Sequence, residues 1–165
     1  MSKKKSKDPP SDGVYRLSVA KNRRARHDYH VEETCEAGIE LHGSEVKTLR
    51  LREVDFADAY ALVTNGECWV HGLRIATYVK AHVQLPDPVR RRRLLLKKRE
   101  IAKLSALSER SGYTLIPLEI YFRGSWAKVL LGVCRGKRDY DKRQSLKADM
   151  AAREIARVKK GARRR

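Results

Sequence analysis

Two β-prone runs meet at the dipeptide Asn65-Gly66, and this junction constrains the fold more than any other part of the sequence. The runs are AYALVT (59–64) and ECWVHGLRIA (67–76). Asparagine followed by glycine tolerates the positive φ angles of a type I′ turn, which joins adjacent antiparallel strands. The sequence therefore predicts a β-hairpin in the middle of the chain.

A second hairpin is predicted where YTLIPLEIYF (113–122) and WAKVLLGVC (126–134) are joined by a short RGS turn. Alternation gives each of these strands two distinct faces. Pro117 points outward in this register, and because it lacks an N–H we expect an edge position or a bulge there. One face holds Ile116, Leu118, Ile120 and Phe122 with Val129, Leu131 and Val133, and the other holds Lys128, Leu130 and Gly132.

The remaining apolar segments predict short strands and two helices. Residues 26–41 alternate loosely, as one bent strand or two short ones, with a bulge or bend at Gly38. One helix is expected from Ser44, whose hydroxyl can cap it, and another after the LLL strand (94–96), with Gly112 as its C′ residue. About six strands without a repeated strand-helix-strand pattern favour a mainly β fold, an OB-like barrel with flanking helices.

Charge is distributed unevenly along the 165 residues. The whole chain has a net charge of +18, so a polyanion is the expected partner. Residues 135–165 hold 13 Lys or Arg against 4 Asp or Glu, which is a net charge of +9. We expect a disordered N-terminal segment (1–13), a barrel domain (14–135) and a basic tail (136–165).

The basic tail contains little material for a core. Asp141 and Gln144 form a capping-box pattern, but an isolated helix after them would be marginal in water. Lys142 and Arg143 would then oppose the helix dipole, which an external anion would relieve. We expect the tail to be disordered or marginally helical alone and helical when bound to a nucleic acid. Its apolar stripe, too thin for insertion into a membrane surface, comprises Leu146, Met150, Ile155 and Val158.

The sequence contains no pattern that indicates a bound metal or a cofactor. Glu45 and Lys47 form the E-x-K pair of some metal-dependent nucleases, but here it falls on an expected helix instead of a core strand. A nuclease is therefore the weaker alternative. Cys35, Cys68 and Cys134 are scattered and are expected to be reduced thiols of a cytoplasmic chain. No segment resembles a signal peptide or a membrane span.

Two polar features are candidates for contact with RNA. Arg90–Arg93 form an unbroken cationic run, which either contacts phosphate or is a solvated face. Tyr140 has no apolar neighbours, so it either stacks on a base or folds back onto the barrel. Both alternatives stay open at the level of the sequence.

Five blocks of sequence carry a resemblance that covers nearly the whole chain. They are NRRARHDYHVEETCEAGIEL (22–41), SEVKTLR (44–50), DPVRRRRLLLKKREI (87–101), GYTLIPLEIYF (112–122) and GKRDYDKR (136–143). In this order and spacing they resemble the SmpB family of SsrA-binding proteins. The resemblance implies an OB-like barrel, no catalysis and a partner that is transfer-messenger RNA (tmRNA, or SsrA RNA).

Family members bind the tRNA-like domain of tmRNA and bring it, charged with alanine, to ribosomes stalled on messages without a stop codon. The nascent chain is then tagged for degradation and the ribosome is released. The resemblance thus implies the stalled ribosome as a second partner, and alanyl-tRNA synthetase and elongation factor Tu as indirect partners through tmRNA. It implies no role at a membrane.

Individual positions are carried over from the family motifs. Glu36 cannot bind phosphate favourably, so it is expected to accept from a base edge or a 2′-hydroxyl, or to hold a lysine in place. For Leu95 the alternative to nucleotide contact is a place in the core. The tmRNA-binding residues implied by the resemblance are Asn22, Glu36, Leu95, Lys97 and Lys128.

The resemblance also implies that the tail enters the decoding centre of the small ribosomal subunit and runs as a helix along the empty mRNA channel. The corresponding residues are Gly136, Lys137, Arg138, Tyr140, Asp141, Lys142, Arg143, Ile155, Lys159 and Lys160. The chain departs from the family at Arg52 and Glu53, where many relatives read Gly-Lys after a helix. A basic ribosomal or initiation-type OB protein is the alternative among binding proteins, but it would not account for the tail.

Overall fold

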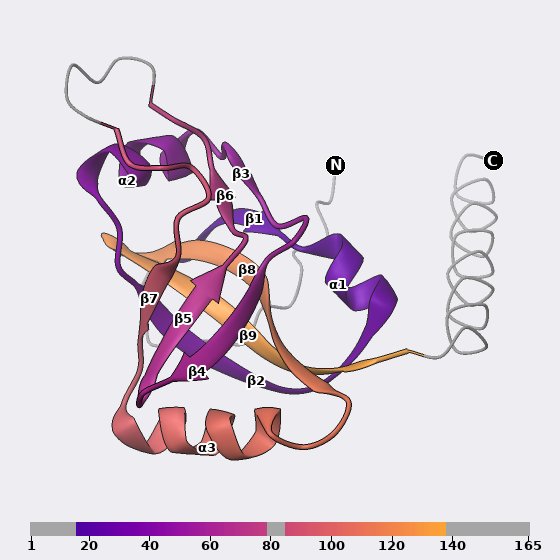
Figure 1. Ribbon diagram of the computed structural model, residues 1–165. Coiled ribbons are helices and arrows are strands. Elements are labelled where there is room, and N and C mark those ends of the chain that lie inside the picture. Colours follow the sequence, from indigo (N-terminus) through magenta and orange to yellow (C-terminus); the bar gives the residue numbers. More distant parts are fainter. Residues whose placement is uncertain (1–15, 79–84, 138–165) are drawn as a thin grey trace, which may run out of the picture.

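The computed structural model describes residues 16–78 and 85–137, which form three helices and nine strands (Figure 1). The sequence predicted two helices and about six strands, and the additional elements are short or lie at an edge. In chain order the elements are β1 (Arg16–Lys21), α1 (Arg23–Asp28), β2 (Tyr29–Ile39), α2 (Gly43–Arg50), β3 (Val54–Asp55), β4 (Tyr60–Thr64), β5 (Glu67–His71), β6 (Arg74–Ile75), β7 (Arg92–Leu95), α3 (Lys98–Ser108), β8 (Tyr113–Arg123) and β9 (Trp126–Gly136).

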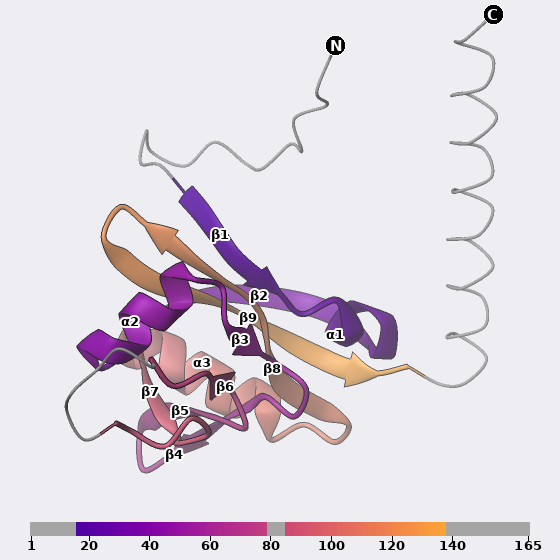
Figure 2. The same cartoon turned by 90° about the horizontal axis from the view of Figure 1, so that it is seen from above.

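Six antiparallel strands close into a barrel in the order β8-β4-β5-β7-β2-β9, and β9 pairs again with β8. Strand β1 adds to the outside of this ring by pairing with the second half of β8. Helix α3 lies across one end of the barrel, while α1 and α2 lie on opposite sides (Figures 1 and 2). This arrangement confirms the predicted mainly β, OB-like barrel with flanking helices.

The central hairpin has the predicted geometry. Asn65 and Gly66 have φ angles of 52° and 74°, as the two central residues of a type I′ turn require. Side chains alternate between more and less exposed along β4, and between half-buried and buried along β5. The predicted hairpin is confirmed. It could be predicted because the turn dipeptide and the strand alternation are both local in the sequence.

Strand β2 differs from its prediction. Residues 26–28 belong to α1, which precedes a single continuous strand. The bulge lies between Val31 and Glu33, and Gly38 pairs regularly with Leu95 and Lys128, so of the two alternatives predicted at Gly38, a bulge or a bend, the bulge was wrong. A Cβ atom at Gly38 would approach the Leu95 Cβ to 3.1 Å, so this glycine instead allows a close approach of neighbouring strands.

A bulge between Pro117 and Glu119 changes the faces of β8. Ile120 and Phe122 join the main core, whereas Ile116 and Leu118 pack in a smaller cluster with other residues. The prediction of one shared face for all four was therefore wrong. Pro117 is fully buried and not outward, and β8 is not an edge strand, but the bulge expected from its missing N–H is present.

The helix boundaries differ from the predicted caps. Helix α2 has His42 as its N-cap, and the Glu45 carboxylate accepts the His42 N–H at 2.8 Å, so the prediction of Ser44 as the cap was wrong. Helix α3 ends at Ser108, and Gly112, with a φ of 85°, lies in the turn before β8 and not at C′. No helix among the described residues has the length and apolar character needed to cross a bilayer.

The main core fills the barrel interior with side chains from every strand of the ring. Val129, Leu131 and Val133 are at most 2% exposed, which confirms the predicted apolar face of β9. All three cysteines are free, and Cys68 and Cys134 are completely buried. Burial raises the pKa of each of these two thiols to about 11, so both are protonated and unreactive near neutral pH.

Candidate nucleic-acid interface

A groove of about 610 Å³ runs over the outer surface of the barrel where β7 and the start of α3 approach β2 and β9. Four of the five residues implied as tmRNA contacts line it: Glu36, Leu95, Lys97 and Lys128. They come from three segments that are distant in the sequence. The structure thus brings together residues that the sequence could name but could not place side by side.

Strand pairing at Gly38 places two of the groove residues on either side of β2. Strand β2 lies between β7 and β9, and Gly38 pairs with Leu95 on one side and Lys128 on the other. Its neighbours Ala37 and Ile39 are buried, so the Gly38 position faces outward. Because Gly38 has no side chain, the Leu95 side chain packs over it, and Lys128 lies on the other side of the same row.

Glu36 lies at the centre of a polar network on this surface. The Tyr121 hydroxyl donates to its Oε2, and its Oε1 lies 3.4 Å from Arg123 Nη1 and 3.5 Å from Lys128 Nζ. Partial burial alone would raise the pKa of Glu36, but the Tyr121 hydrogen bond and the two cations outweigh it and lower the pKa. Glu36 is therefore ionised at neutral pH and holds Lys128 in place, one of its two expected roles.

Leu95 is 51% exposed on the outer face of β7, whereas the adjacent Leu94 is 2% exposed. The core alternative for Leu95 is therefore wrong. Lys97 is the N-cap of α3, and its backbone N–H donates to Glu100 Oε2 at 2.8 Å. Its ammonium group is thus carried at an exposed helix start next to the groove.

The charges that line the groove are balanced. Three carboxylates and three cations take part: Glu36, Glu67, Glu100, Arg93, Lys97 and Lys128. Arg93 bridges Glu40 at 2.9 Å and Glu67 at 3.0 Å, which holds the groove wall at the β4–β5 turn. Such a surface favours a partner with donors, acceptors and phosphates over one that offers only negative charge.

Asn22 lies outside this groove, at the start of α1. Its Oδ1 accepts the Ala25 N–H at 2.9 Å, and its Nδ2 donates to the Pro117 carbonyl at 3.1 Å. Its own backbone N–H donates to the Leu118 carbonyl at 2.8 Å, and the residue is 8% exposed. The structure therefore gives Asn22 a role in holding α1 against the β8 bulge.

Only two of the implied ribosome-binding residues lie in the described part of the chain. Gly136 ends β9, so the strand extends one residue past the expected boundary at 135. The Lys137 backbone N–H donates to the Asp28 carbonyl at 2.9 Å, and its Nζ donates to the Arg26 carbonyl at 3.1 Å. Arg138, Tyr140, Asp141, Lys142, Arg143, Ile155, Lys159 and Lys160 lie outside the described residues, as do segment 1–13 and the expected tail helix.

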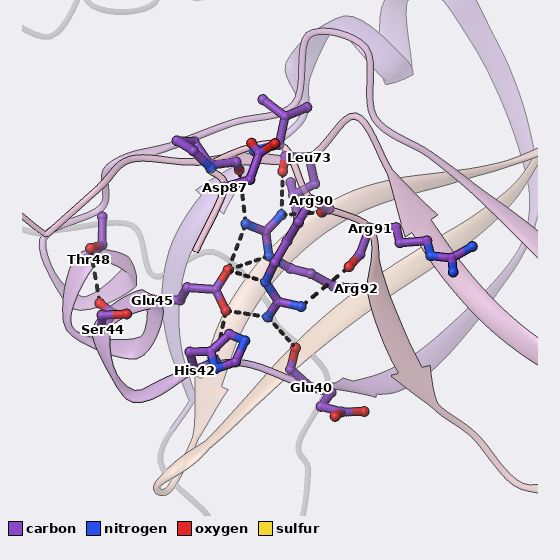
Figure 3. Close-up of polar contacts among 12 residues, drawn as sticks. Glu40, His42, Ser44, Glu45, Thr48, Leu73, Asp87, Arg90, Arg91 and Arg92 are labelled. Carbon is purple, nitrogen blue, oxygen red and sulfur yellow. Dashed lines mark hydrogen bonds and ion pairs between the residues drawn. The ribbon is translucent and has the colours of Figure 1, made fainter. Parts of the chain in front are cut away.

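Within the run Arg90–Arg93, the side chains of Arg90 and Arg92 are engaged within the protein (Figure 3). Arg92 is fully buried, and its Nε donates to Glu45 Oε1 at 2.8 Å. Arg90 Nη2 donates to Glu45 Oε2 at 2.5 Å. Arg92 also donates to the carbonyls of Leu73 at 2.6 Å and Pro88 at 2.9 Å. This run is neither a simple solvated face nor a free set of phosphate ligands.

The Glu45 carboxylate is occupied in the same network, which does not support the nuclease alternative. Both of its oxygens accept hydrogen bonds, and the residue is 4% exposed. It lies on α2 and not on a core strand. Over residues 16–78 and 85–137, no group of three or more His, Cys, Asp or Glu side chains is arranged to hold a metal ion.

Tyr121 and Arg123 are the site residues that sequence reasoning missed. Both lie on the outward face of β8 after the bulge, and both contact Glu36. Strand alternation alone places Tyr121 on the face opposite the core, which is correct. It does not indicate which residue Tyr121 contacts. Only the pairing of β8 with β9 and of β9 with β2 brings its hydroxyl to Glu36.

The closed barrel and its polar groove define the chain as an OB-like barrel protein of the type that presents its surface to oligonucleotides. A family model described as "SmpB protein" matches residues 19–161. The chain therefore belongs to the SmpB family. The SsrA-binding proteins of Bacillus cereus (strain AH820) and Bacillus anthracis are each 49% identical to it over 140 residues, covering 85% of this chain and 90% of theirs.

A solved structure, "tmRNA-SmpB: a journey to the center of the bacterial ribosome", is also similar to this chain. It has a TM-score of 0.64 and 47% sequence identity, and the match covers 77% of this chain and 93% of the other. At this level of identity the likeness extends beyond the fold to individual side chains.

Proposed function

We propose that this protein binds tmRNA through the groove and brings it to stalled ribosomes for trans-translation. The observation that carries the proposal is the convergence of Glu36, Leu95, Lys97 and Lys128 on one groove. The SsrA-binding relatives and the tmRNA-SmpB ribosome structure support the same partners. As a ribosome-bound factor, the protein acts in the cytoplasm.

The two parts of the chain divide the work. The barrel binds the tRNA-like domain of tmRNA, and the basic tail reads the vacant decoding centre and mRNA channel. Lys137 marks the point of division, because its hydrogen bonds to the Asp28 and Arg26 carbonyls tie the end of β9 to α1. Synthetase and elongation factor Tu act on the charged RNA and are indirect partners.

No step of this function requires catalysis by the protein. The groove supplies an apolar contact at Leu95, ammonium groups at Lys97 and Lys128, and an ionised acceptor at Glu36. Such groups recognise a folded RNA by its shape, its 2′-hydroxyls and the edges of unpaired bases. The balanced charge of the groove predicts an affinity that salt weakens only partly.

The test is binding of the full chain to the tRNA-like domain, to an ordinary tRNA and to a hairpin of equal length, across a salt series. We expect a preference for the tRNA-like domain that survives added salt. Lys128→Met should weaken this binding about tenfold, while Lys21→Met, which removes the same charge from β1, should not. Equal binding to all three RNAs that falls together with salt would favour a general basic OB protein.

A further inference from the structure

The outer face of the β4–β5–β7 sheet carries a row of aromatic and cationic side chains outside the groove. Tyr60 pairs with His71 across β4 and β5, and their rings stack with centroids 5.3 Å apart at an interplanar angle of 13°. Leu62 pairs with Trp69 two residues further along, and Trp69 pairs with Arg93 on β7. These side chains therefore share one continuous surface.

This surface is exposed along β4, while Trp69 and His71 on β5 are half-buried. Tyr60 and Leu62 are 42% and 46% exposed, while Ala61 between them is 2% exposed and belongs to the core. Single exposed apolar residues are normal on protein surfaces and need no partner. Here, however, apolar and aromatic side chains are cross-strand neighbours in adjacent rows, so together they form a patch.

Arg91 adds positive charge to the patch. Its guanidinium lies 5.0 Å from the centroid of the Trp69 ring. Figure 3 shows its side chain directed away from Glu45, toward which Arg90 and Arg92 point. Among the residues that the structure describes, no carboxylate forms an ion pair with Arg91. Its charge is thus available to a phosphate, whereas those of Arg90 and Arg92 are used within the protein.

The patch is continuous with the groove. Arg93 both lines the groove and pairs with Trp69 on the neighbouring strand. At the other end, Tyr60 lines a second cavity of about 360 Å³ beside α1. Paired rows on one face of a sheet lie about 7 Å apart along the strand. The aromatic rows therefore form a path across the barrel from one hollow to the other.

We propose that this face, formed by Tyr60, Leu62, Trp69, His71 and Arg91, is a stacking platform for unpaired nucleotides of the RNA held in the groove. Aromatic rings and arginine planes stack on bases irrespective of sequence, and a cation beside them neutralises the strand. A membrane partner would need a broad apolar face, and this one is interrupted by His71 and Arg91. The platform extends the proposed function and rests on it.

The two tryptophans of the chain allow a direct test, because Trp69 is on the platform and Trp126 is at the start of β9 with 74% exposure. Trp126 pairs with Arg123 and lies two residues before Lys128 on the same face of β9, so it is close to the groove. The variant Trp126→Phe leaves Trp69 as the single fluorophore, and Trp69→Phe leaves Trp126. Each is titrated with the tRNA-like domain and with a short oligoadenylate, while labelled RNA reports binding independently.

Stacking of a base predicts that RNA quenches Trp69 strongly in the Trp126→Phe variant, whereas Trp126 reports only on RNA in the groove. In affinity measurements on the full chain, Trp69→Leu should weaken RNA binding about tenfold, and the control variant Lys21→Met should have no effect. If neither RNA quenches Trp69, the platform is wrong, even when labelled RNA still binds with full affinity. Failure of the unmodified protein to bind the tRNA-like domain would instead overturn the proposed function. In that case, quenching of Trp69 by the oligoadenylate would be the remaining test of the platform.

Discussion

The guanidinium of Arg92 and the carboxylate of Glu45 form an ion pair inside the protein, with Arg92 fully buried and Glu45 4% exposed. Their closest atoms are 2.8 Å apart, and they are separated by 47 positions in the sequence. Arg90 shares the same carboxylate. This pair joins α2 to the first residue of β7, the strand that carries the groove residue Leu95.

Removal of Glu45 should therefore destabilise the fold severely. We expect Glu45→Ala to lower the free energy of unfolding by about 3–5 kcal/mol, because it leaves the buried Arg92 charge without a partner. Glu40→Ala is the matched control, since Glu40 pairs with Arg93 at the surface, where solvent screens the pair and its removal should change stability little. Urea unfolding of both variants measures the difference between their unfolding free energies. Equal losses would contradict a structural role for the buried Glu45–Arg92 pair.

The same pair predicts a pH dependence. Burial alone would raise the pKa of Glu45, but hydrogen bonds from Arg90 and His42 and the charge of Arg92 lower it overall. A carboxyl group whose pKa is lowered by folding stabilises the protein fully above its unfolded value of about 4.3, and this stabilisation is lost as the pH falls through the lower folded value. In urea titrations, the stability difference between the unmodified protein and Glu45→Gln should be constant near neutral pH and shrink only below about pH 4.

Arg52 is strained at the end of α2. Its φ angle is 64°, and its backbone N–H and that of Glu53 donate to the carbonyls of Leu49 and Thr48. Glycine adopts this conformation without steric cost, so we expect Arg52→Gly to raise the free energy of unfolding by about 0.5–1 kcal/mol. Arg52→Ala keeps the steric cost and removes only the charge. A comparable gain in unfolding free energy in the alanine variant would show that the stabilisation comes from relief of charge repulsion and not from relief of backbone strain.

Asn22 should act on RNA binding only through the fold. Asn22→Ala removes the N-cap of α1 and leaves the Pro117 carbonyl without its donor, for an expected loss of about 2–4 kcal/mol. Asn22→Asp keeps the acceptor for the Ala25 N–H and loses the donor to the Pro117 carbonyl. Its loss of unfolding free energy should therefore be smaller than that of Asn22→Ala. RNA affinity measured well below the melting transition should change less than about twofold. A larger loss in a fully folded variant would establish direct contact with RNA.

A chain that ends after Lys137 retains the last hydrogen bond between β9 and α1. We expect its melting temperature and its affinity for the tRNA-like domain to match those of the full chain, because the barrel is complete. Tagging of nascent chains on stalled ribosomes should be lost. In the full-length chain, joint replacement of Asp141, Lys142 and Arg143 by alanine should also abolish tagging without lowering the melting temperature. Loss of RNA affinity on truncation would contradict the division between barrel and tail.

The resemblance read from the sequence named the groove residues without their geometry. Glu36, Leu95 and Lys128 are separated by many residues, and nothing local indicates that they are neighbours. Gly38 shows why, because its signal in the sequence was interpreted as a bulge or a bend. Its actual role, leaving room for the Leu95 side chain, depends on the pairing of β2 with β7.

The sequence by itself determined the features that arise from neighbouring residues. These are the turn at Asn65 and Gly66, the alternating core face of β9 and the concentration of positive charge at the end of the chain. Turn preference, strand alternation and net charge involve short separations or simple sums, so they can be read directly.

Only the tertiary structure decided the closure of the barrel, the change of face at Pro117 and the fate of the Arg90–Arg93 run. A bulge shifts every later side chain of a strand to the opposite face, and one residue of difference in register is not visible in an alternating pattern. Likewise, a row of four arginines looks the same whether it faces solvent or a buried carboxylate. The partner of Arg92 is Glu45, and the fold has to form before the two can meet.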